Sequence, residues 1–266
     1  MSLEAKTIVL TGASSGIGAA TAEVLAKQGA DIIALDIKPV ESAAIQFHSV
    51  DLSDPDAIDR FVQELDSPID GLCNVAGVPG SLPPEVVLRV NYLGLRRLTT
   101  KLMPKVRDNG AVVNVASAAG TGWREKKDKI FELLDVEGDE GALAWLAEQQ
   151  MSGAETYDFS KEAVIVFSML IASREWHRGV RVNSVSPGAI ETPILDDFYQ
   201  TMDSEALNQF KRQAGGRDGR PEEIAEAIAF MVGPGSRWVN GTDLLVDGGA
   251  EVLMNLESRA VAPRAS

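Results

Sequence analysis

Short apolar runs alternate with longer amphipathic segments between residues 6 and 120, and this alternation restricts the possible folds more than any other feature. Each run is rich in β-branched residues and ends near a Gly, Asp or Ser, as buried strands do. The runs are KTIVL, DIIALD, FHSVD, IDGLCNVAG and AVVNVAS. Helical patterns fill intervals between them, at 19–28 and at 53–65. Strands that alternate with helices in this way form a parallel sheet that is covered on both faces.

The second half of the chain continues the same rhythm. Residues 154–177 indicate a long helix, VRVNSV a buried strand, residues 221–231 a helix that begins with Pro, and TDLLVDGG a last strand. A chain of 266 residues fits a single α/β domain. We therefore expect one Rossmann-type domain over residues 1–251, with a doubly wound parallel sheet and helices on both faces.

Three segments depart from this rhythm. Residues 123–156 are polar and charged, contain two short helical patterns, and form an expected helical insertion. Residues 190–216 are a long connection rich in aromatic and apolar residues, which we expect to be a substrate lid, because long connections in compact domains are usually functional. Residues 252–266 have no periodicity and are expected to form a partly disordered C-terminal tail.

Charge and cysteine content limit the possible partners. The formal net charge is −14, from 39 acidic and 25 basic residues, and such a field repels nucleic acid and anionic membrane surfaces. Cys73 is the single cysteine, and His48 and His177 lie far apart, which argues against a disulfide and a zinc site. No signal-peptide pattern and no apolar run long enough to span a membrane is found. We expect a soluble, cytoplasmic protein without a metal.

A glycine-rich segment, TGASSGIG at residues 11–18, follows the first expected strand. Glycines there allow the backbone to turn tightly and to approach a pyrophosphate, whose charge is stabilised by the following helix N-terminus. The spacing G-x-x-x-G-x-G is a variant of the dinucleotide-binding fingerprint. A plain βα turn could carry the same glycines, but the position after the first strand favours a dinucleotide. The expected contacts are Gly12, Ser14, Ser15, Gly16, Ile17 and Gly18.

Asp36 ends the second expected strand and bears on the choice of cofactor. A carboxylate at this point accepts hydrogen bonds from the adenosine ribose hydroxyls and repels the 2′-phosphate of NADP. The glycine loop contains no Arg or Lys, although Lys38 lies close to Asp36 in the sequence. We therefore predict that the cofactor is NAD.

Tyr157 and Lys161 are four residues apart near the start of a helix, so both side chains lie on one face. A tyrosine titrates near pH ~10, but a neighbouring ammonium and a positively charged nicotinamide would stabilise its phenolate. Such a pair is usually no more than a solvated helix surface. Its interpretation as an acid–base pair depends on the other residues at the same edge of the sheet.

Further candidates follow the expected strands at their carboxyl ends, where doubly wound sheets bind ligands. They are Asn74 and Gly77 in NVAG, Ser117 after AVVNVA, and Pro187, Gly188 and Thr192 after VRVNSV. Asn91 lies in the helical run VNYLGLRRLT, where an amide among apolar residues is costly unless it is hydrogen-bonded.

These motifs, taken in order, resemble the short-chain dehydrogenase/reductase family over residues 6–249. The matching segments are TGASSGIG, Asp36, DLSD with Asp51, NVAG, VNYLG, VVNVAS, YDFSK, SPGAIETP and VDGG. The resemblance implies an NAD(H)-dependent enzyme that interconverts an alcohol and its carbonyl. It implies further cofactor contacts at Asp51, Leu52, Asn74, Ala76, Gly77, Tyr157, Lys161, Pro187, Gly188, Ile190 and Thr192.

The resemblance also assigns the catalytic roles. Tyr157 would be the general acid for reduction and the general base for oxidation. Ser117 would hold and polarise the substrate oxygen, and Lys161 would bind the nicotinamide ribose and lower the pKa of the tyrosine. Asn91 would support a water in the proton relay. Asp51 would contact the adenine edge, and Ile190 and Thr192 the carboxamide.

The chain departs from the family pattern in two respects. Val75 and Ala116 stand where the family often has Asn and Ser, but neither position carries the chemistry. The interval between Ser117 and Tyr157 is much longer than the family commonly has, and the insertion 123–156 accounts for it. With this insertion, the chain resembles a subgroup that holds 3α-hydroxysteroid dehydrogenase/carbonyl reductases and coniferyl-alcohol dehydrogenases, the latter more closely.

Residues expected near the substrate are mostly apolar or aromatic, which suits a bulky alcohol or ketone of the coniferyl, benzylic or hydroxysteroid type. They are Val78, Pro79, Trp123, Leu195, Phe198, Tyr199 and Met202. Several of them could equally pack the lid against the sheet. We further expect the insertion to form one wall of the pocket and to alter the helix face through which relatives form tetramers. A homodimer would follow, and a homotetramer is the alternative.

Two alternatives remain open at this point. A 3-oxoacyl-carrier-protein reductase would favour NADP and basic loops that dock an acidic carrier, and the small basic run at Arg124, Lys126, Lys127 and Lys129 is compatible with one. Asp36 and the strong acidity argue against it. A catalytically silent dinucleotide-binding protein would typically lack the catalytic Tyr, Lys or Ser, and all three are present here.

Overall fold

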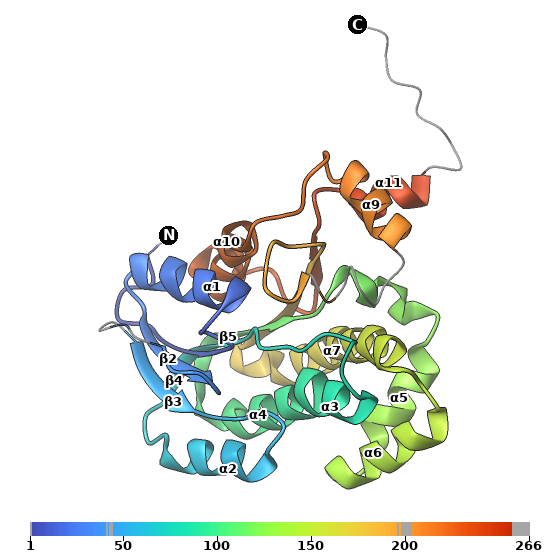
Figure 1. The fold of residues 1–266 in the computed structure, drawn as a ribbon. Helices are drawn as coiled ribbons and strands as arrows, with labels where there is room; N and C mark the ends of the chain where they lie inside the picture. Colours follow the sequence, from blue (N-terminus) through green and yellow to red (C-terminus); the bar gives the residue numbers. More distant parts are fainter. Residues whose placement is uncertain (1, 41, 43–44, 196, 198–203, 257–266) are drawn as a thin grey trace, which may run out of the picture.

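The computed structural model describes residues 2–40, 42, 45–195, 197 and 204–256, and this part of the chain contains a parallel sheet of seven strands. The strands lie in the order β3-β2-β1-β4-β5-β6-β7, so the direction of winding reverses between β1 and β4 (Figure 1). Their bounds are β1 Thr7–Thr11, β2 Asp31–Asp36, β3 Ile45–Ser49, β4 Ile69–Asn74, β5 Val106–Val115, β6 Arg181–Pro187 and β7 Asp243–Val246. The predicted Rossmann-type, doubly wound fold is confirmed.

Helices cover both faces of the sheet (Figure 1). Helices α1 Gly16–Lys27 and α10 Pro221–Val232 pack together on one face. The other face carries α2 Pro55–Glu64, α4 Leu95–Leu102 and α7 Gly153–Glu175. The helical layers leave the ends of the strands uncovered, so a ligand can bind at the carboxyl ends of the strands.

Two apolar cores form, one on each side of the sheet. Successive side chains of a strand point to opposite faces, so Ile8 and Leu10 of β1 belong to the core beneath α1 and α10, whereas Val9 belongs to the other core. Strands that are buried on both faces need apolar residues at every position. This explains why the sequence shows continuous apolar runs rather than alternation.

The remaining helical elements lie between these layers and at their rims. The helices are α3 Pro84–Leu88, α5 Lys127–Asp135, α6 Gly138–Gln149, α9 Ser204–Gln213 and α11 Ala250–Leu256. Short 3-10 segments are η2 Met103–Lys105, η3 Ala118–Arg124, η4 Trp176–Arg178 and η5 Pro234–Ser236, and η1 Arg89–Gly94 is a π-helical segment between α3 and α4. No helix in the described part of the chain has the length and apolar character to cross a bilayer.

The insertion is helical, and both its helices bury apolar residues against the domain. Ile130 of α5 and Leu146 of α6 are buried, and the Trp145 ring stacks on Phe159 of α7 with the ring centroids 5.5 Å apart. Ion pairs also fix the first turn of α6 to η1 and α4. They join Arg89 to Glu140 at 3.0 Å, and Arg96 and Arg97 to Asp139 at 3.4 and 3.3 Å.

Helix α11 extends to residue 256, beyond the point at 251 where we placed the end of the ordered domain. The side chain of Asp247 explains its start: Oδ1 accepts a hydrogen bond from the Gly249 amide, and Oδ2 accepts one from the Glu251 amide. Helix α11 lies beside α9 of the predicted lid (Figure 1). Part of the expected tail is therefore a helix. Its seven residues show no clear helical period, so the sequence does not indicate it.

Candidate active site

The glycine loop is folded as a dinucleotide-binding turn requires. Gly12 has a φ of 76°, and a Cβ there would lie 2.8 Å from the backbone of Ala76. A Cβ at Gly18 would lie 1.9 Å from the carbonyl oxygen of Gly12. Both positions therefore require glycine, because the loop passes so close to β4 and folds back on itself.

The N-terminus of α1 is open to an anion. Ser15 is its N-cap residue but makes no hydrogen bond from its side chain to the helix, and the first turn carries no acidic residue. The amide groups of the first turn and the positive end of the helix dipole therefore remain available to a phosphate. Together with the two close approaches at glycine, this cradle fits the pyrophosphate of a dinucleotide.

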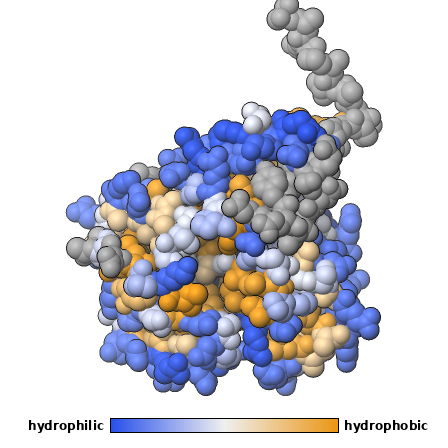
Figure 2. All heavy atoms as spheres, in the orientation of Figure 1, coloured by the Kyte–Doolittle hydropathy of each residue, from blue (hydrophilic) through white to orange (hydrophobic). Residues whose placement is uncertain are grey.

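A groove of about 350 Å³ runs from this loop across the carboxyl edge of the sheet. Twelve of the predicted cofactor residues line it, and they come from the loops after β1, β2, β3, β4 and β6. These are Gly12, Ser14, Ser15, Gly16, Ile17, Gly18, Asp36, Asp51, Leu52, Ala76, Gly77 and Thr192. Val78 and Pro79, which we predicted near the substrate, line the same groove. Figure 2 shows that hydrophobic residues gather near the middle of this face and hydrophilic residues around its rim.

Asp36 lies at the wall of the groove and is fixed by two backbone groups. Its Oδ2 accepts a hydrogen bond from the Ser14 amide at 2.9 Å, and its Oδ1 accepts one from the Lys38 amide at 3.0 Å. Each carboxylate oxygen can accept further hydrogen bonds. The carboxylate is thus oriented between the glycine loop and the end of β2, and it keeps acceptor capacity for two hydroxyl groups.

Asn74 lies inside the protein and not on the lining of this groove. It is 1% exposed, and its Nδ2 donates hydrogen bonds to Thr99 Oγ1 and Asn114 Oδ1. The Asn114 amide in turn donates to Ser168 Oγ on α7. The amide at position 74 therefore connects β4 to β5 and the helical layer, and the residues that follow it, Ala76 and Gly77, reach the groove.

The segment after β6 divides between the groove and the layer behind it. Thr192 lines the groove, and a Cβ at Gly16 would lie 3.1 Å from its Cγ2, so the glycine loop and this segment face each other. Ile190 is buried and pairs with Gly219 in a short parallel bridge. At Gly188, a Cβ would contact Phe210 and Asp247 at 2.8 and 2.9 Å.

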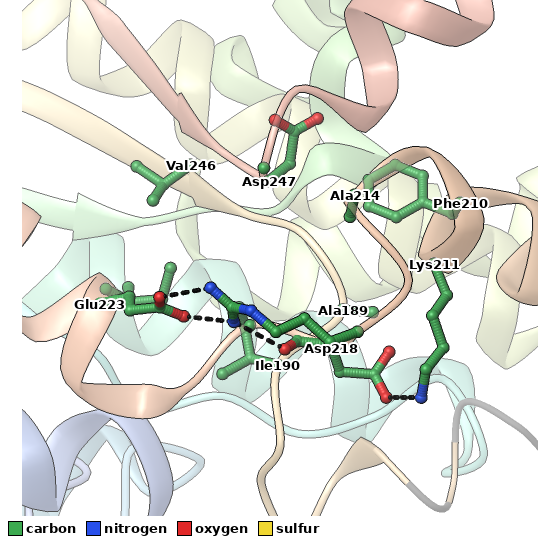
Figure 3. Close-up of a pocket in the computed structure, with 13 residues that line it drawn as sticks. Ala189, Ile190, Phe210, Lys211, Ala214, Asp218, Glu223, Val246 and Asp247 are labelled. Carbon is green, nitrogen blue, oxygen red and sulfur yellow. Dashed lines mark hydrogen bonds and ion pairs between the residues drawn. The ribbon is translucent and has the colours of Figure 1, made fainter.

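A second pocket, of about 240 Å³, lies behind Ala189 and Ile190, between α9 and α10 (Figure 3). Its charged side chains form pairs: Lys211 contacts Asp218 at 2.5 Å, and Arg217 binds both carboxylate oxygens of Glu223. The Phe210 ring lies above them, beside Asp247 (Figure 3). The contacts of Phe210 and Lys211 attach the predicted lid to the domain, and Asp247 adds a further carboxylate to the lining beyond the two ion pairs.

Ser117, Tyr157 and Lys161 come together beside the groove. Ser117 lies two residues after β5 and caps η3, where its Oγ accepts a hydrogen bond from the Ala119 amide, and its side chain is hydrogen-bonded to Tyr157. Lys161 lies one turn further along α7, with its Nζ 5.7 Å from the centroid of the Tyr157 ring and 3.2 Å from the Val115 carbonyl oxygen. The predicted serine, tyrosine and lysine thus form one cluster.

The pKa values in this cluster are set by burial. Desolvation raises the pKa of Tyr157 to about 12, and the hydrogen bond from Ser117 lowers it only in part. Desolvation also lowers the pKa of Lys161 to about 8. Desolvation outweighs the hydrogen bond from Ser117, and the nearby Asp158 carboxylate adds to the rise. The lowering of the tyrosine pKa by Lys161 together with a positively charged nicotinamide stays a prediction.

Asn91 occupies the π-helical segment η1, and this geometry removes its amide from the ordinary helical pattern. Its Oδ1 accepts a hydrogen bond from the Val78 amide at 2.8 Å, and its Nδ2 donates to the Val78 carbonyl at 3.0 Å. A Cβ at Gly77 would lie 3.3 Å from Asn91 Oδ1 and 3.4 Å from Lys161 Nζ. The amide oxygen and the ammonium therefore both lie near the point that a Gly77 Cβ would occupy, and the amide is hydrogen-bonded, as its burial requires.

The remaining predicted substrate residues are less directly placed. Trp123 packs against the apolar core beneath α7, and the Arg124 guanidinium lies 4.4 Å from the centroid of its ring. The Leu195 amide donates to the Thr192 carbonyl. Phe198, Tyr199 and Met202 lie outside the described residues.

Sequence reasoning missed a group of residues that join η3 to α7. A Cβ at Gly120 would lie 2.9 Å from Ile165 Cδ1 and 3.0 Å from the Lys161 backbone, and Lys126 forms an ion pair with the buried Glu162. One signal was present: Asp158 and Glu162 place two carboxylates at helical spacing in an otherwise apolar helix. Without the position of η3, however, these carboxylates resemble an ordinary solvated stripe.

The comparisons agree with this geometry. A family model described as short chain dehydrogenase matches residues 6–126, and one described as enoyl-(acyl carrier protein) reductase matches residues 142–251. The chain belongs to the short-chain dehydrogenase/reductase family, whose members use NAD or NADP, and it is an oxidoreductase of that family.

Individual relatives cover almost the whole chain. Coniferyl-alcohol dehydrogenase from Pseudomonas sp. (strain HR199 / DSM 7063) is 41% identical over 94% of this chain and 98% of its own length. The 3-alpha-hydroxysteroid dehydrogenase/carbonyl reductase of Comamonas testosteroni is 31% identical over 93% and 97%. Among solved structures, 3-alpha-hydroxysteroid dehydrogenase from Pseudomonas sp. B-0831 in complex with NADH is 33% identical, with a TM-score of 0.78 over 96% of this chain and 99% of that one. The predicted resemblance is confirmed.

Proposed function

We propose that the protein is an NAD(H)-dependent alcohol dehydrogenase that interconverts an apolar or aromatic alcohol and its carbonyl. The observation that carries this proposal is the cluster of Ser117, Tyr157 and Lys161 beside the dinucleotide groove. The glycine loop and Asp36 would hold a nicotinamide dinucleotide, which would supply the hydride acceptor for alcohol oxidation and the hydride donor for carbonyl reduction.

Tyr157 is the proposed acid–base residue. In oxidation, its phenolate takes the hydroxyl proton of the alcohol, and in reduction its hydroxyl returns that proton to the carbonyl oxygen. Ser117 is hydrogen-bonded to Tyr157, so one oxygen of the substrate can contact both hydroxyl groups. Burial raises the pKa of Tyr157, so positive charge near the ring is needed to bring this pKa closer to neutral pH.

Lys161 and Asn91 have supporting roles in this proposal. The depressed pKa of Lys161, about 8, shows that its ammonium is poorly compensated by the chain alone, and hydroxyl groups of a ribose would supply the missing hydrogen bonds. Asn91 Oδ1 and Lys161 Nζ lie 3.3 and 3.4 Å from the point that a Gly77 Cβ would occupy, so a side chain at this position would crowd both groups. Water held between these two groups would carry the proton from Tyr157 towards solvent.

We propose NAD rather than NADP because of Asp36. Its carboxylate is already oriented by the Ser14 and Lys38 amides at the groove wall, and a 2′-phosphate beside it would bring two like charges into contact. Lys38 is exposed and its ammonium has no ion pair among the described residues, so it could reduce this repulsion but not remove it.

The substrate class is proposed from the groove and from the relatives together. Val78, Pro79 and Ile194 give the groove an apolar wall, which suits an aromatic or alicyclic skeleton. The relative with 41% identity is named for coniferyl alcohol, and two others are named for 3-alpha-hydroxysteroids. A coniferyl-type or benzylic alcohol is our first candidate and a hydroxysteroid the second.

The basic run does not favour the alternative of a carrier-protein reductase. Each of its four cations lies against a group of the insertion or of the helix beneath it, and Lys126 is held in an ion pair with the carboxylate of Glu162. The pairs are Arg124 with Trp123, Lys126 with Glu162, Lys127 with Phe131 and Lys129 with Trp145. The presence of Ser117, Tyr157 and Lys161 in one cluster likewise argues against a catalytically silent protein.

The insertion and the assembly of the protein are also matters of proposal. Helix α6 packs on the outer side of α3 and α4. A second subunit that bound on this side of the domain would therefore contact the insertion. We propose a cytoplasmic homodimer, with a homotetramer as the alternative. Light scattering during size-exclusion chromatography decides between them, and a variant that lacks 123–156 but keeps both its assembly and its substrate preference would contradict the role given to the insertion.

The proposed activity is tested by NADH formation from NAD+ with coniferyl-type, benzylic and steroid alcohols at alkaline pH. We expect turnover of at least one class, with little turnover with NADP+. Tyr157→Phe should lower kcat by about 10²–10⁴-fold, because it removes the proton acceptor but little volume. It should leave NADH affinity almost unchanged. Failure of every alcohol, or a fully active Tyr157→Phe variant, would refute the proposal.

A further inference from the structure

The segment from Ser117 to Lys126 is attached to one short stretch of α7 at three points. At its beginning, Ser117 is hydrogen-bonded to Tyr157. In its middle, Gly120 lies so close to α7 that a Cβ would come within 3.0 Å of the Lys161 carbonyl carbon. At its end, Lys126 Nζ lies 2.9 Å from Glu162 Oε1. The catalytic serine and the wall that follows it are therefore aligned on the helix that carries the catalytic tyrosine and lysine.

Glu162 has an unusual environment for a carboxylate. Its side chain is 2% exposed, its Oε1 contacts Lys126, and its Oε2 has no hydrogen-bond partner among the described residues. Desolvation raises the pKa of Glu162, Lys126 lowers it, and Glu125 raises it further. Asp158, one turn earlier on α7, faces Lys126 and is also influenced by Glu162 and Glu155. One half-exposed lysine thus balances two carboxylates.

Stability alone does not account for such a pair. Burying a carboxylate with one unsatisfied oxygen is costly, and buried ion pairs can often be replaced by apolar side chains without loss of stability. What an ion pair of this kind supplies is a fixed relative position for the two elements that carry it. The elements here are the N-cap of α5, directly after η3, and the turn of α7 that contains Lys161.

We propose that Glu162 is a positioning residue for the alcohol-oxidising centre, which through Lys126 fixes the segment 117–126 and thereby holds the Ser117 hydroxyl against Tyr157. The inference rests on the proposed function, because it assigns Glu162 a role in that same chemistry. Glu162 itself touches neither substrate nor dinucleotide. It acts by limiting how far η3 can move along α7.

The test compares Glu162→Gln with wild type. Glutamine keeps the shape and one acceptor oxygen but loses the charge that holds Lys126. We expect kcat for alcohol oxidation to fall about tenfold, because a small displacement of Ser117 misaligns the substrate oxygen. Because the hydrogen bond from Ser117 lowers the pKa of Tyr157, we also expect the acid limb of the kcat–pH profile to move to higher pH. The Kd for NADH should remain within about twofold of wild type.

Further variants separate positioning from a general effect on folding. Lys126→Met should reproduce both changes, and Lys126→Arg, which keeps the ion pair, should restore the wild-type profile. Glu140→Gln breaks an exposed ion pair at the other end of the same insertion and serves as the matched control, with activity and profile unchanged. If Glu162→Gln does not fold, Lys126→Met carries the same test, because the side chain that it alters is half-exposed.

The outcomes distinguish this inference from the proposed function. A wild-type protein that oxidises no alcohol refutes the function itself. Turnover by wild type, together with an unchanged kcat and an unchanged pH profile in folded Glu162→Gln or Lys126→Met, overturns only the positioning role. Loss of kcat without movement of the pH profile also overturns it, because a purely structural weakening would not act through the Ser117–Tyr157 hydrogen bond.

Discussion

Tyr157 and Lys161 are buried in adjacent turns of α7, and burial moves their pKa values in opposite directions, to about 12 and about 8. A buried phenol resists ionisation and a buried amine resists protonation, so the chain by itself disfavours the charged form of each group. The positive charge of an oxidised nicotinamide would favour the phenolate. The chemistry of the cluster is therefore expected to depend on the dinucleotide in a way that the two residues alone do not achieve.

Asp36 gives a prediction about cofactor choice. Asp36→Asn keeps the shape of the side chain but removes the charge that would oppose a 2′-phosphate. We expect the ratio of kcat/KM for NAD+ to that for NADP+ to fall by about tenfold or more, which corresponds to about 1.4 kcal/mol. Asp31→Asn, at the opposite end of β2, is the matched control and should leave the ratio unchanged. An unchanged ratio in Asp36→Asn would show that selectivity lies elsewhere.

Asp158 gives a prediction about stability and pH. Burial raises its pKa from 3.8 to about 6, with Lys126 opposing the shift and Glu162 and Glu155 adding to it. Because the folded value is higher, the native state holds a proton that the unfolded state loses, so stability falls as pH rises from about 4 to about 6 and remains lower above that range. We expect Asp158→Asn to be more stable than wild type above pH ~6, by about 1 kcal/mol after allowance for its partial exposure.

Thermal unfolding of both proteins across this pH range measures the effect. The melting temperatures of the two proteins should converge below pH ~3, where Asp158 is protonated in both the folded and the unfolded state, and should diverge as pH rises. A constant difference between the proteins at every pH would mean that the ionisation of Asp158 is not coupled to folding.

At the scale of elements, the strands were predictable because burial on both faces leaves little freedom in their composition. The glycine loop and the residues at the groove were predictable for a related reason: close backbone approach at Gly12 and Gly18 permits no side chain. Asn74 was predicted at the cofactor edge, but the structure places it within the chain of amides that ends at Ser168. An asparagine that follows a buried strand carries no signal that distinguishes these two positions.

The helical details were less predictable. The π-helical segment around Asn91 depends on how α3 and α4 pack, and a sequence period of about 3.6 residues cannot register one extra residue in a turn. The start of α11 depends on Asp247, which reads as a turn residue in VDGG. The contact between η3 and α7 depends on the whole insertion folding back, which no local pattern describes.

Gly120 gives a prediction at the element scale. In Gly120→Ala the new methyl group would meet Ile165 Cδ1 at 2.9 Å and the Lys161 backbone at 3.0–3.1 Å, so η3 must move away from α7. We expect a loss of about 1–3 kcal/mol in the free energy of unfolding, together with a fall in kcat for alcohol oxidation of about tenfold. Gly141→Ala, in which the methyl group meets only a Val136 side chain at 2.9 Å, is the control.

Chemical denaturation and steady-state kinetics give both quantities. The two effects should occur together in Gly120→Ala, because one displacement causes both. If Gly120→Ala lost stability but kept its kcat, the position of η3 would not control the position of Ser117.

The molecule as a whole is strongly acidic, but several basic residues lie close together at the start of the insertion. The chain has a net charge of −14, but its basic residues near position 126 are directed at aromatic rings and carboxylates of the same chain. The expectation from composition that the protein does not bind nucleic acid stays a prediction, and composition could not indicate where individual cations would lie. Their partners are distant in sequence and are set by the packing of α5 and α6 on α7.

The attachment of residues 117–126 to α7 at both ends has a consequence for how this protein can change over evolutionary time. Ser117 is joined to the helix that carries Tyr157 by direct contacts of the segment 117–126, in addition to the chain between Lys126 and Ser152. The length of that intervening stretch is thus not tied to the distance between the two hydroxyl groups. We expect insertions and deletions in its exposed turns to be tolerated during evolution as long as its buried residues, such as Ile130 and Leu146, keep their contacts with the core.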